Sequence, residues 1–318
     1  MLNGKRIFIT GGAGYLGSNL VRRYHSSNEI VVFSRDEAKH YYLKKEFPNI
    51  ICKIGDVRNF DLMKRMSDGC DIGIFTASLK QIGAVDQNYE EAVKVIIDGA
   101  INSRRCAEEN KMESACFISS DKSRSATTLY GSMKFVAGEL FIVNAGVSKL
   151  PVKLSSAIYG NVFNSTGSII PLIWDSIKKK YPLTLYSDEM TRFMLDIERA
   201  MQLIEFGLSL NGYNVIPFVK SFRIKDLFDI YNEKFGLTYK LGEPRISEKI
   251  HELMISKEEM PRVNYDIETN NFYMHYEKIQ TGVEHPVEFP NDEYSSKDFV
   301  VSKAELIDIL EKNNYFAI

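Results

Sequence analysis

The chain has 318 residues, with 40 Lys or Arg against 42 Asp or Glu and a net charge of -2 at pH 7. This balance argues against a nucleic-acid-binding protein, because binding to the phosphate backbone usually shows as a basic excess. No apolar run approaches the roughly 20 residues that a membrane-spanning helix needs. The four cysteines lack the spacing of a metal site, so none is expected. We therefore expect a cytoplasmic protein without nucleic-acid or membrane partners.

Short runs of β-forming residues recur along the first half of the chain. They cover residues 6–10, 29–33, 50–54, 71–75 and 115–119. Between them lie segments with helical spacing of apolar residues, such as 62–66 and 92–107. This alternation predicts an α/β fold with a Rossmann-type doubly wound parallel sheet. Its functional loops are expected at the carboxyl ends of the strands.

A glycine-rich loop, TGGAGYLG at residues 10–17, joins the first strand to the first helix. Gly11 permits a tight turn, Gly14 lets the backbone approach a pyrophosphate, and Gly17 allows close packing of helix on strand. The N–H groups at the start of the helix favour an anion. The loop therefore predicts a dinucleotide site, in which Tyr15 and Leu16 also contact the cofactor.

The residues that end the second strand indicate which dinucleotide is expected. An NAD site places an acid there, on the ribose 2′-hydroxyl, whereas this chain has Ser34 and Arg35. A guanidinium matches phosphate oxygens, so the pair favours NADP, while Asp36 keeps NAD as the alternative. Further along, Asp56 is placed either to accept from the adenine amino group or to cap a helix. The other expected cofactor contacts are Val57, Ala77 and Lys80.

A tyrosine and a lysine four residues apart follow the fifth strand. Tyr130 and Lys134 lie on one face of a predicted helix. There the Lys134 ammonium can touch the nicotinamide ribose and depress the pKa of the Tyr130 phenol. The phenol needs this help, because with a pKa of about 10 it is a poor base at neutral pH. The pair predicts a catalytic site beside the cofactor.

The regular alternation of strands and helices fades after residue 160, where turn-forming residues become frequent. We expect residues 1–165 to form the NADP-binding Rossmann domain, with 194–212 returning a helix to it. Residues 166–193 and 213–318 are expected to form a smaller substrate-binding α/β region with a C-terminal extension.

These motifs resemble those of the extended short-chain dehydrogenases, and among them the C5-inverting UDP-N-acetylglucosamine 4,6-dehydratases. The resemblance runs over nearly the whole chain. It includes SDK at 120–122, YGNV at 159–162, MTRF at 190–193, EKIHE at 248–252 and YSS at 294–296. The Asp-Lys pair at 121 and 122 is similar to that of the inverting branch. The relatives that dehydrate with retention look like they carry Asp-Glu at these two positions instead.

The resemblance implies a dehydratase that converts UDP-N-acetylglucosamine into a UDP-4-keto-6-deoxyhexosamine inverted at carbon 5. It implies Lys122 as the base at carbon 5, Asp121 as the group assisting the departing hydroxyl, and Tyr130 in the oxidation of carbon 4. A lysine base must be partly neutral, so burial or Lys134 should lower the pKa of Lys122. The expected substrate contacts are Lys80, Asn161, Arg192, Arg245 and Glu248, with the two arginines at the diphosphate.

Three positions depart from the family pattern, namely Gln81, Ile96 and Ile158, where the family has His, Asn and Arg. They leave open a UDP-sugar 4-epimerase or 4-keto reductase, which needs Tyr130 and Lys134 but not Lys122. A non-catalytic NADP-binding regulator is a further alternative, although such a protein often loses the Tyr/Lys pair. The resemblance also implies a homo-oligomer.

Overall fold

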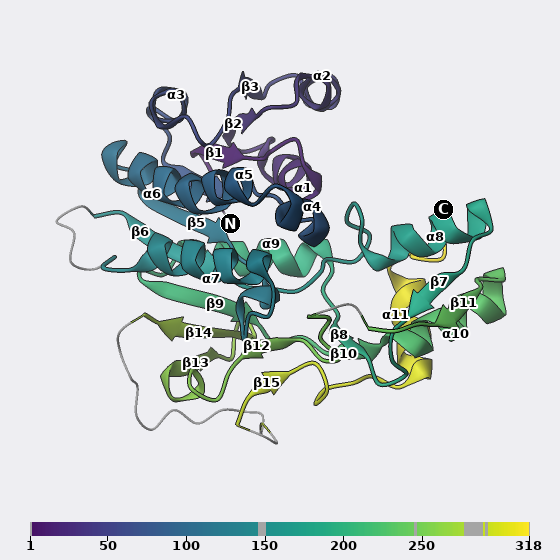
Figure 1. Cartoon of the computed structure of the whole chain (residues 1–318). Coiled ribbons are helices and arrows are strands. Elements are labelled where there is room, and N and C mark those ends of the chain that lie inside the picture. Colours follow the sequence, from purple (N-terminus) through teal and green to yellow (C-terminus); the bar gives the residue numbers. More distant parts are fainter. Residues whose placement is uncertain (1, 146–150, 245–246, 277–288, 290–291, 318) are drawn as a thin grey trace.

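The computed structural model describes residues 2–145, 151–244, 247–276, 289 and 292–317. Within these residues, a nine-stranded sheet runs through the molecule in the order β13-β14-β9-β6-β5-β4-β1-β2-β3 (Figure 1). Its strands are β1 (Arg6–Thr10), β2 (Glu29–Ser34), β3 (Ile51–Ile54), β4 (Ile72–Phe75), β5 (Ser114–Ile118), β6 (Lys153–Ala157), β9 (Tyr213–Pro217), β13 (Val263–Asp266) and β14 (Asn271–His275). The predicted Rossmann-type sheet is confirmed, and β1 to β5 lie within one residue of their predicted bounds.

The strands run parallel from β3 across to β9, and β14 and β13 then add an antiparallel pair at the edge. Both faces of the central strands are buried. In β1, Ile7 and Ile9 enter the core on one face while Phe8 enters the core on the other. Burial on both faces explains why these strands are continuous apolar runs without polar alternation.

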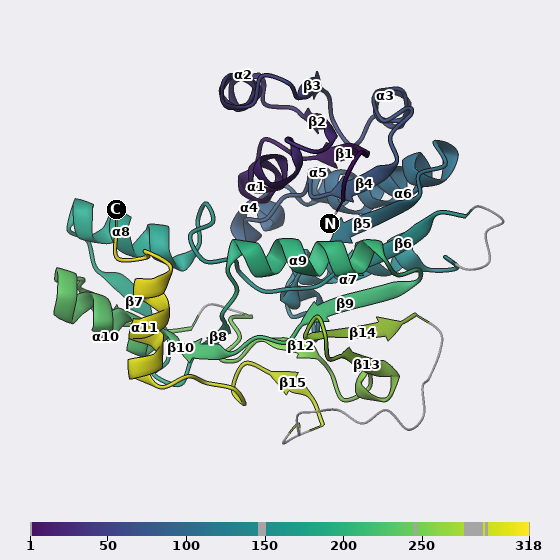
Figure 2. The same cartoon turned by 180° about the vertical axis from the view of Figure 1, so that it is seen from behind.

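Helices cover both faces of the sheet, as Figures 1 and 2 show from opposite sides. On one face lie α3 (Phe60–Met66), α4 (Ile82–Gln87), α5 (Tyr89–Val93), α6 (Gly99–Glu109) and α7 (Leu129–Ile142). On the other lie α1 (Tyr15–Tyr24), α2 (Glu37–Glu46) and α9 (Ile197–Leu208). The single helix expected over 92–107 is divided by a π-helical turn, η1 (Lys94–Asp98), a feature often found near functional sites.

A lobe beside the sheet has its own apolar core. It consists of α8 (Ile169–Lys179), β7 (Leu183–Leu185), β8 (Thr191–Phe193), β10 (Ser221–Arg223), α10 (Ile224–Phe235), β11 (Tyr239–Leu241) and α11 (Lys303–Lys312). A further small core includes residues of β12 (Leu253–Ile255) and β15 (Tyr294–Ser295), near the 3₁₀ helix η3 (Met260–Arg262). Because β9, β13 and β14 extend the main sheet, residues 213–318 contribute to both parts, and the division into domains stays a prediction.

In the part of the chain that the structure describes, no helix combines the length and the apolar character needed to cross a bilayer.

Packing of α1 on the glycine loop gives a first prediction. A Cβ added at Gly17 would lie 2.4 Å from the Gly12 Cα and 2.5 Å from the Gly11 carbonyl oxygen. Since these are backbone atoms, Gly17→Ala should destabilise the protein by about 1–3 kcal/mol or more, as overpacking does. Denaturant unfolding measures this. Gly83→Ala in α4 is the control, because its Cβ would meet nothing within 4 Å; equal midpoints for the two variants would contradict the prediction.

Candidate active site

The glycine loop forms a cradle that side chains would fill. Gly11 has a φ of 66°, and a Cβ on it would lie 2.8 Å from the Thr76 hydroxyl and 3.0 Å from the Ala77 backbone. Gly14 is the N-cap of α1, without a side-chain cap and without an acidic residue in the first turn. The helix therefore presents uncapped N–H groups beside a surface of bare backbone, which fits a dinucleotide pyrophosphate.

Two polar residues that follow β2, Arg35 and Asp36, have different surroundings. Asp36 caps α2 by accepting from the Lys39 N–H at 3.0 Å, and its carboxylate also pairs with the Lys39 ammonium at 3.0 Å. The Asp36 carboxylate is thus engaged by α2. The Arg35 side chain, in contrast, is more than half exposed, and its Nη1 makes one long contact of 3.5 Å with the Asp56 Oδ2. The acid that kept NAD open is therefore held by a helix cap, and the guanidinium remains accessible.

A buried histidine that sequence reasoning missed lies next to Ser34. The His40 Nε2 is 2.7 Å from the Ser34 Oγ, and burial lowers the pKa of His40. His40 follows Ser34 by six residues on α2, and no spacing rule that we applied relates these two positions. Its effect is to fix the Ser34 hydroxyl at the end of β2.

Asp56 does not cap α3, which is capped by Asn59. Its carboxylate instead pairs with the Arg58 guanidinium at 2.7 Å and accepts from the Arg58 N–H at 2.9 Å. Nearby, Val57 is buried, and its carbonyl accepts from the Asn102 side chain at 2.9 Å. The adenine contact predicted for Asp56 stays a prediction.

Lys80 connects the loop after β4 to the segment that precedes α8. Its ammonium donates to the Thr166 carbonyl, and partial desolvation, followed by repulsion from Lys39, lowers the pKa of Lys80 although the residue is exposed. Tyr15 crosses the same gap by donating to the Phe163 carbonyl at 3.4 Å. Two of the expected cofactor residues, Tyr15 and Lys80, therefore contact the segment 163–166, which precedes α8.

The loop after β5 carries the predicted catalytic pair Asp121 and Lys122 in a 3₁₀ turn, η2 (Asp121–Ser123). Asp121 is 2% exposed, and its Oδ1 accepts from the Ser120 hydroxyl at 2.9 Å. A Cβ on Gly160, which follows β6, would lie 2.9 Å from the Asp121 Oδ2. Gly160 therefore gives the carboxyl room to lie against the backbone of the neighbouring strand end.

Lys122 lies between two carboxylates. Its Nζ is 3.4 Å from the Asp121 Oδ1 and 3.2 Å from the Glu252 Oε1. Burial alone would lower the pKa of Lys122, but Asp121 and Glu252 outweigh it and raise the pKa above its usual value. Burial raises the pKa of Asp121, while Lys122 and Arg192 hold the pKa of Glu252 low despite burial.

Two expectations about pKa values are wrong. The pKa of Lys122 is raised, not lowered, because two carboxylates surround it. The pKa of Tyr130 is raised by burial, and the groups that oppose this are Lys122 and Ser120, not Lys134. Lys134 instead donates to the Ile118 carbonyl and lies 4.6 Å from the centre of the Phe117 ring.

Arg192 on β8 is held by carboxylates. Its Nη2 is 2.7 Å from the Glu248 Oε1, its Nε is 3.5 Å from the Glu252 Oε1, and its Nη1 donates to the Thr191 carbonyl at 2.7 Å. The diphosphate contact predicted for Arg192 stays a prediction. Asn161 is exposed after β6, and Arg245 lies outside the described residues.

Glu252 is a second residue of the site that sequence reasoning missed. It stood inside the quoted EKIHE motif, but only Glu248 was assigned a role. The one available signal was its position directly before the apolar strand β12, where a carboxylate would be buried. His251 beside it shares a hydrogen bond of 2.8 Å between its Nδ1 and the Thr191 hydroxyl, which joins the start of β8 to the segment before β12.

The three departures lie in different places. Ile96 is buried in the π-helical turn η1, and Ile158 is buried after β6 in the core that includes β12. Gln81 is the N-cap of α4, and its side-chain nitrogen would lie 3.1 Å from a Cβ on Gly167. Two apolar side chains thus stand at positions for which the family pattern implies polar ones.

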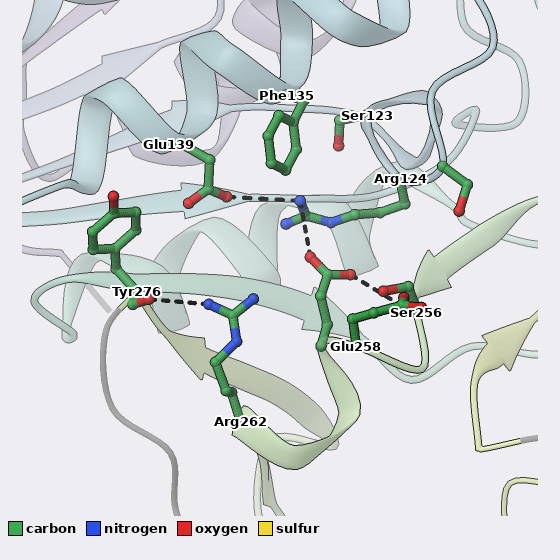
Figure 3. A pocket seen from close by; sticks show the side chains of 10 residues that line it. Ser123, Arg124, Phe135, Glu139, Ser256, Glu258, Arg262 and Tyr276 are labelled. Carbon is green, nitrogen blue, oxygen red and sulfur yellow. Dashed lines mark hydrogen bonds and ion pairs between the residues drawn. The ribbon is translucent and has the colours of Figure 1, made fainter.

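A pocket of about 530 Å³ lies beside the loop after β5, between α7 and the segment after β12 (Figure 3). Arg124, 3% exposed, pairs with Glu259 at 3.1 Å and with Glu139 of α7 at 3.7 Å. The Arg124 carbonyl accepts from the Lys249 ammonium at 2.6 Å. These contacts fasten the loop at 121–124 to the segment that contains Glu252.

The chain is similar to known proteins in sequence and in fold. A family model described as polysaccharide biosynthesis protein matches residues 7–274, so the chain belongs to that family. It is 30% identical over 284 residues to a UDP-N-acetylglucosamine 4,6-dehydratase (inverting) of Campylobacter jejuni, covering 86% of this chain and 83% of that one. It is 31% identical over 276 residues to a UDP-glucose 4-epimerase of Rickettsia massiliae, covering 82% and 80%.

Among solved structures, the X-ray structure of Pen from Bacillus thuringiensis matches with a TM-score of 0.88 and 25% identity, covering 98% of this chain and 99% of that one. The resemblance to extended short-chain dehydrogenases, and to inverting dehydratases among them, is confirmed. The relatives include both dehydratases and epimerases, so the family leaves the choice of reaction open.

The buried Lys134 gives a prediction about pH. Burial lowers its pKa to about 7, well below the value of about 10.4 that is usual for an exposed lysine. Between these values the unfolded chain binds more protons, so stability should rise with pH from about 7 to about 10, by at most about 4 kcal/mol. Denaturant unfolding across this range measures it.

Lys134→Met should lack this rise, because the titrating group is gone. The control is Lys312→Met, which removes an exposed lysine at the end of α11 and should behave as the unaltered protein does. The same pH slope in Lys134→Met and the unaltered protein would contradict the assignment.

Proposed function

We propose that this protein is an NADP-dependent UDP-N-acetylglucosamine 4,6-dehydratase that inverts carbon 5 and yields a UDP-4-keto-6-deoxyhexosamine. The observation that carries the proposal is the ion pair of buried Asp121 and half-buried Lys122 after β5, next to Tyr130 on α7. A reaction that needs only oxidation and reduction at carbon 4 has no use for this additional acid and base. The relative named as an inverting dehydratase supports the same reading.

The cofactor would be held by the glycine cradle at Gly11, Gly14 and Gly17, with Arg35 at the 2′-phosphate and Lys134 at the nicotinamide ribose. When bound, it supplies a hydride acceptor for carbon 4 and a hydride donor for carbon 6. Around it we expect the other residues that the sequence indicated, namely Tyr15, Leu16, Ser34, Asp56, Val57, Ala77 and Lys80.

The environments of Tyr130 and Asp121 suit the proposed division of labour, whereas Lys122 must first lose the proton that its raised pKa favours. Tyr130 accepts the proton of the carbon 4 hydroxyl, for which the nearby Lys122 ammonium stabilises the phenolate. Asp121, whose pKa is raised by burial, can carry a proton to the hydroxyl that leaves carbon 6. Lys122 takes the carbon 5 proton after its ammonium has released a proton to solvent, since only the free amine is a base.

The substrate would extend from this cluster toward the lobe. We propose Lys80, Asn161, Arg192, Arg245 and Glu248 as its contacts. The cytoplasmic location, the homo-oligomer and the division into two domains stay predictions as well.

A UDP-sugar 4-epimerase is the second candidate function. It is favoured by the relative with that name and by Ile96 and Ile158, which stand where the dehydratase pattern implies polar residues. Incubation with UDP-N-acetylglucosamine distinguishes the reactions, because dehydration removes the mass of one water and epimerisation leaves the mass unchanged.

The cofactor assignment predicts a selective loss of affinity. Arg35→Ala should weaken NADP about tenfold to a hundredfold while NAD is little affected, because a charge-assisted contact is made only to the 2′-phosphate. Calorimetric titration with both cofactors measures this. Arg58→Ala is the control: it also removes a partner of Asp56, and any loss should be equal for the two cofactors. Equal weakening by Arg35→Ala would count against NADP.

The dehydratase assignment predicts separate failures for the two catalytic side chains. Lys122→Met should abolish dehydration and the exchange of solvent deuterium into carbon 5, while NADP binding and the fold are retained. Tyr130→Phe should fail earlier, with little reduced cofactor formed on addition of sugar, because the carbon 4 alcohol has lost its proton acceptor. Mass spectrometry follows the exchange. Exchange at the unaltered rate in Lys122→Met would remove this residue from the reaction.

A further inference from the structure

The carboxylate of Glu252 is buried at the centre of the candidate site. It is 3% exposed, and its Oε1 lies 3.2 Å from the Lys122 Nζ and 3.5 Å from the Arg192 Nε. Its other oxygen, Oε2, is buried without a hydrogen-bond partner among the described residues. A buried ion pair adds little net stability because both charges lose water, so stability alone does not explain this carboxylate.

The backbone holds Glu252 in this place from both sides. Its N–H donates to the Ser296 hydroxyl at 2.9 Å, and its carbonyl accepts from the Ser296 N–H at 2.9 Å. The contacts of Arg124 with Glu259 and Lys249 fasten the catalytic loop to the same segment. Figure 3 shows Arg124 reaching from the loop toward Glu139 of α7, so the loop is fixed on that side too. The carboxylate and Lys122 therefore have little freedom to separate.

We propose that Glu252 is a positioning residue for Lys122, which holds the Lys122 amine beside the sugar site and keeps it an ammonium ion until substrate is bound. This inference rests on the proposed function, in which Lys122 is the base at carbon 5. Glu252 then sets the pH above which the base becomes available, without itself touching the reacting carbon.

Charged and titratable groups face Lys122 from each element around it. They are Asp121 on η2, Tyr130 on α7, Arg192 on β8, and Lys249 and Glu252 before β12. The two carboxylates raise the pKa of Lys122 and Arg192 lowers it. Without the Glu252 charge, one of the two groups that raise the pKa of Lys122 is lost. Burial and the nearby cations, which favour the neutral amine, then lower this pKa.

The test compares the pH at which Lys122 loses its proton in the unaltered protein and in the Glu252→Gln variant. In the unaltered protein, the rate of deuterium exchange into carbon 5 should rise with pH as Lys122 loses its proton. In Glu252→Gln, the midpoint of this rise should move to lower pH by about one unit or more, as expected for the loss of an adjacent opposite charge. Acylation of Lys122 by an amine-selective reagent, followed by peptide mass spectrometry, should show the same displacement without substrate.

Glu248→Gln is the matched control. Glu248 belongs to the same segment and lies 2.7 Å from the Arg192 Nη2, but Glu252 is the glutamate in contact with the Lys122 Nζ. Substrate affinity is expected to fall in this variant while both midpoints stay in place. An unchanged midpoint in Glu252→Gln overturns the inference, and so does an equal displacement in Glu248→Gln.

Two further measurements keep the inference separate from protein folding and from the proposed function. If Glu252→Gln does not fold, Glu252→Asp moves the carboxylate away from Nζ and should still lower the acylation midpoint; an unchanged midpoint overturns the inference. If the unaltered protein neither exchanges carbon 5 nor dehydrates the sugar, the proposed function fails. The acylation midpoints then still decide whether Glu252 controls the protonation of Lys122.

Discussion

The site depends on the parallel alignment of β1, β4, β5 and β6, because this brings the ends of strands far apart in sequence to one edge. Thr10 pairs with Phe75, Phe75 with Phe117, and Ile118 with Ala157. From these ends leave the glycine loop, the loop with Lys80, the Asp121–Lys122 turn and Gly160. A single edge of the sheet therefore presents the anion cradle, the acid and base groups, and the room beside Asp121 that glycine provides.

The buried and half-buried charges at this edge influence one another. As a result, the pKa values of Asp121, Lys122, Tyr130 and Glu252 depend on each other. Lys122 is kept charged by Asp121 and Glu252, and its charge in turn holds the pKa of Glu252 low and opposes the rise at Tyr130. Lys134 differs, because burial dominates its environment and lowers its pKa. Substrate binding, which brings new charges and excludes water, is thus expected to redistribute protons among the whole group.

Local patterns predicted the elements that depend on local physics. The apolar runs of β1 to β5 and the glycines around α1 were recognised because strand burial and close backbone approach leave a mark in adjacent residues. The π-helical turn at Lys94–Asp98 was missed, since its apolar spacing is compatible with an ordinary helix. Local patterns do not distinguish the roles of Asp36 and Asp56, because a carboxylate after a strand can cap a helix, pair with an arginine or bind a ligand.

The sequence by itself determined the doubly wound sheet, because strand patterns are short-range properties, and its motifs identified the family. It also predicts a dinucleotide site at the glycine loop and a catalytic role for Asp121, Lys122, Tyr130 and Lys134. Only the tertiary structure decided which charges meet. Lys122 and Glu252 are separated by 130 positions in the chain, and their contact exists because the segment before β12 packs on the loop after β5. The pKa of a buried group depends on such partners and on its desolvation, and neither can be read from the neighbouring residues.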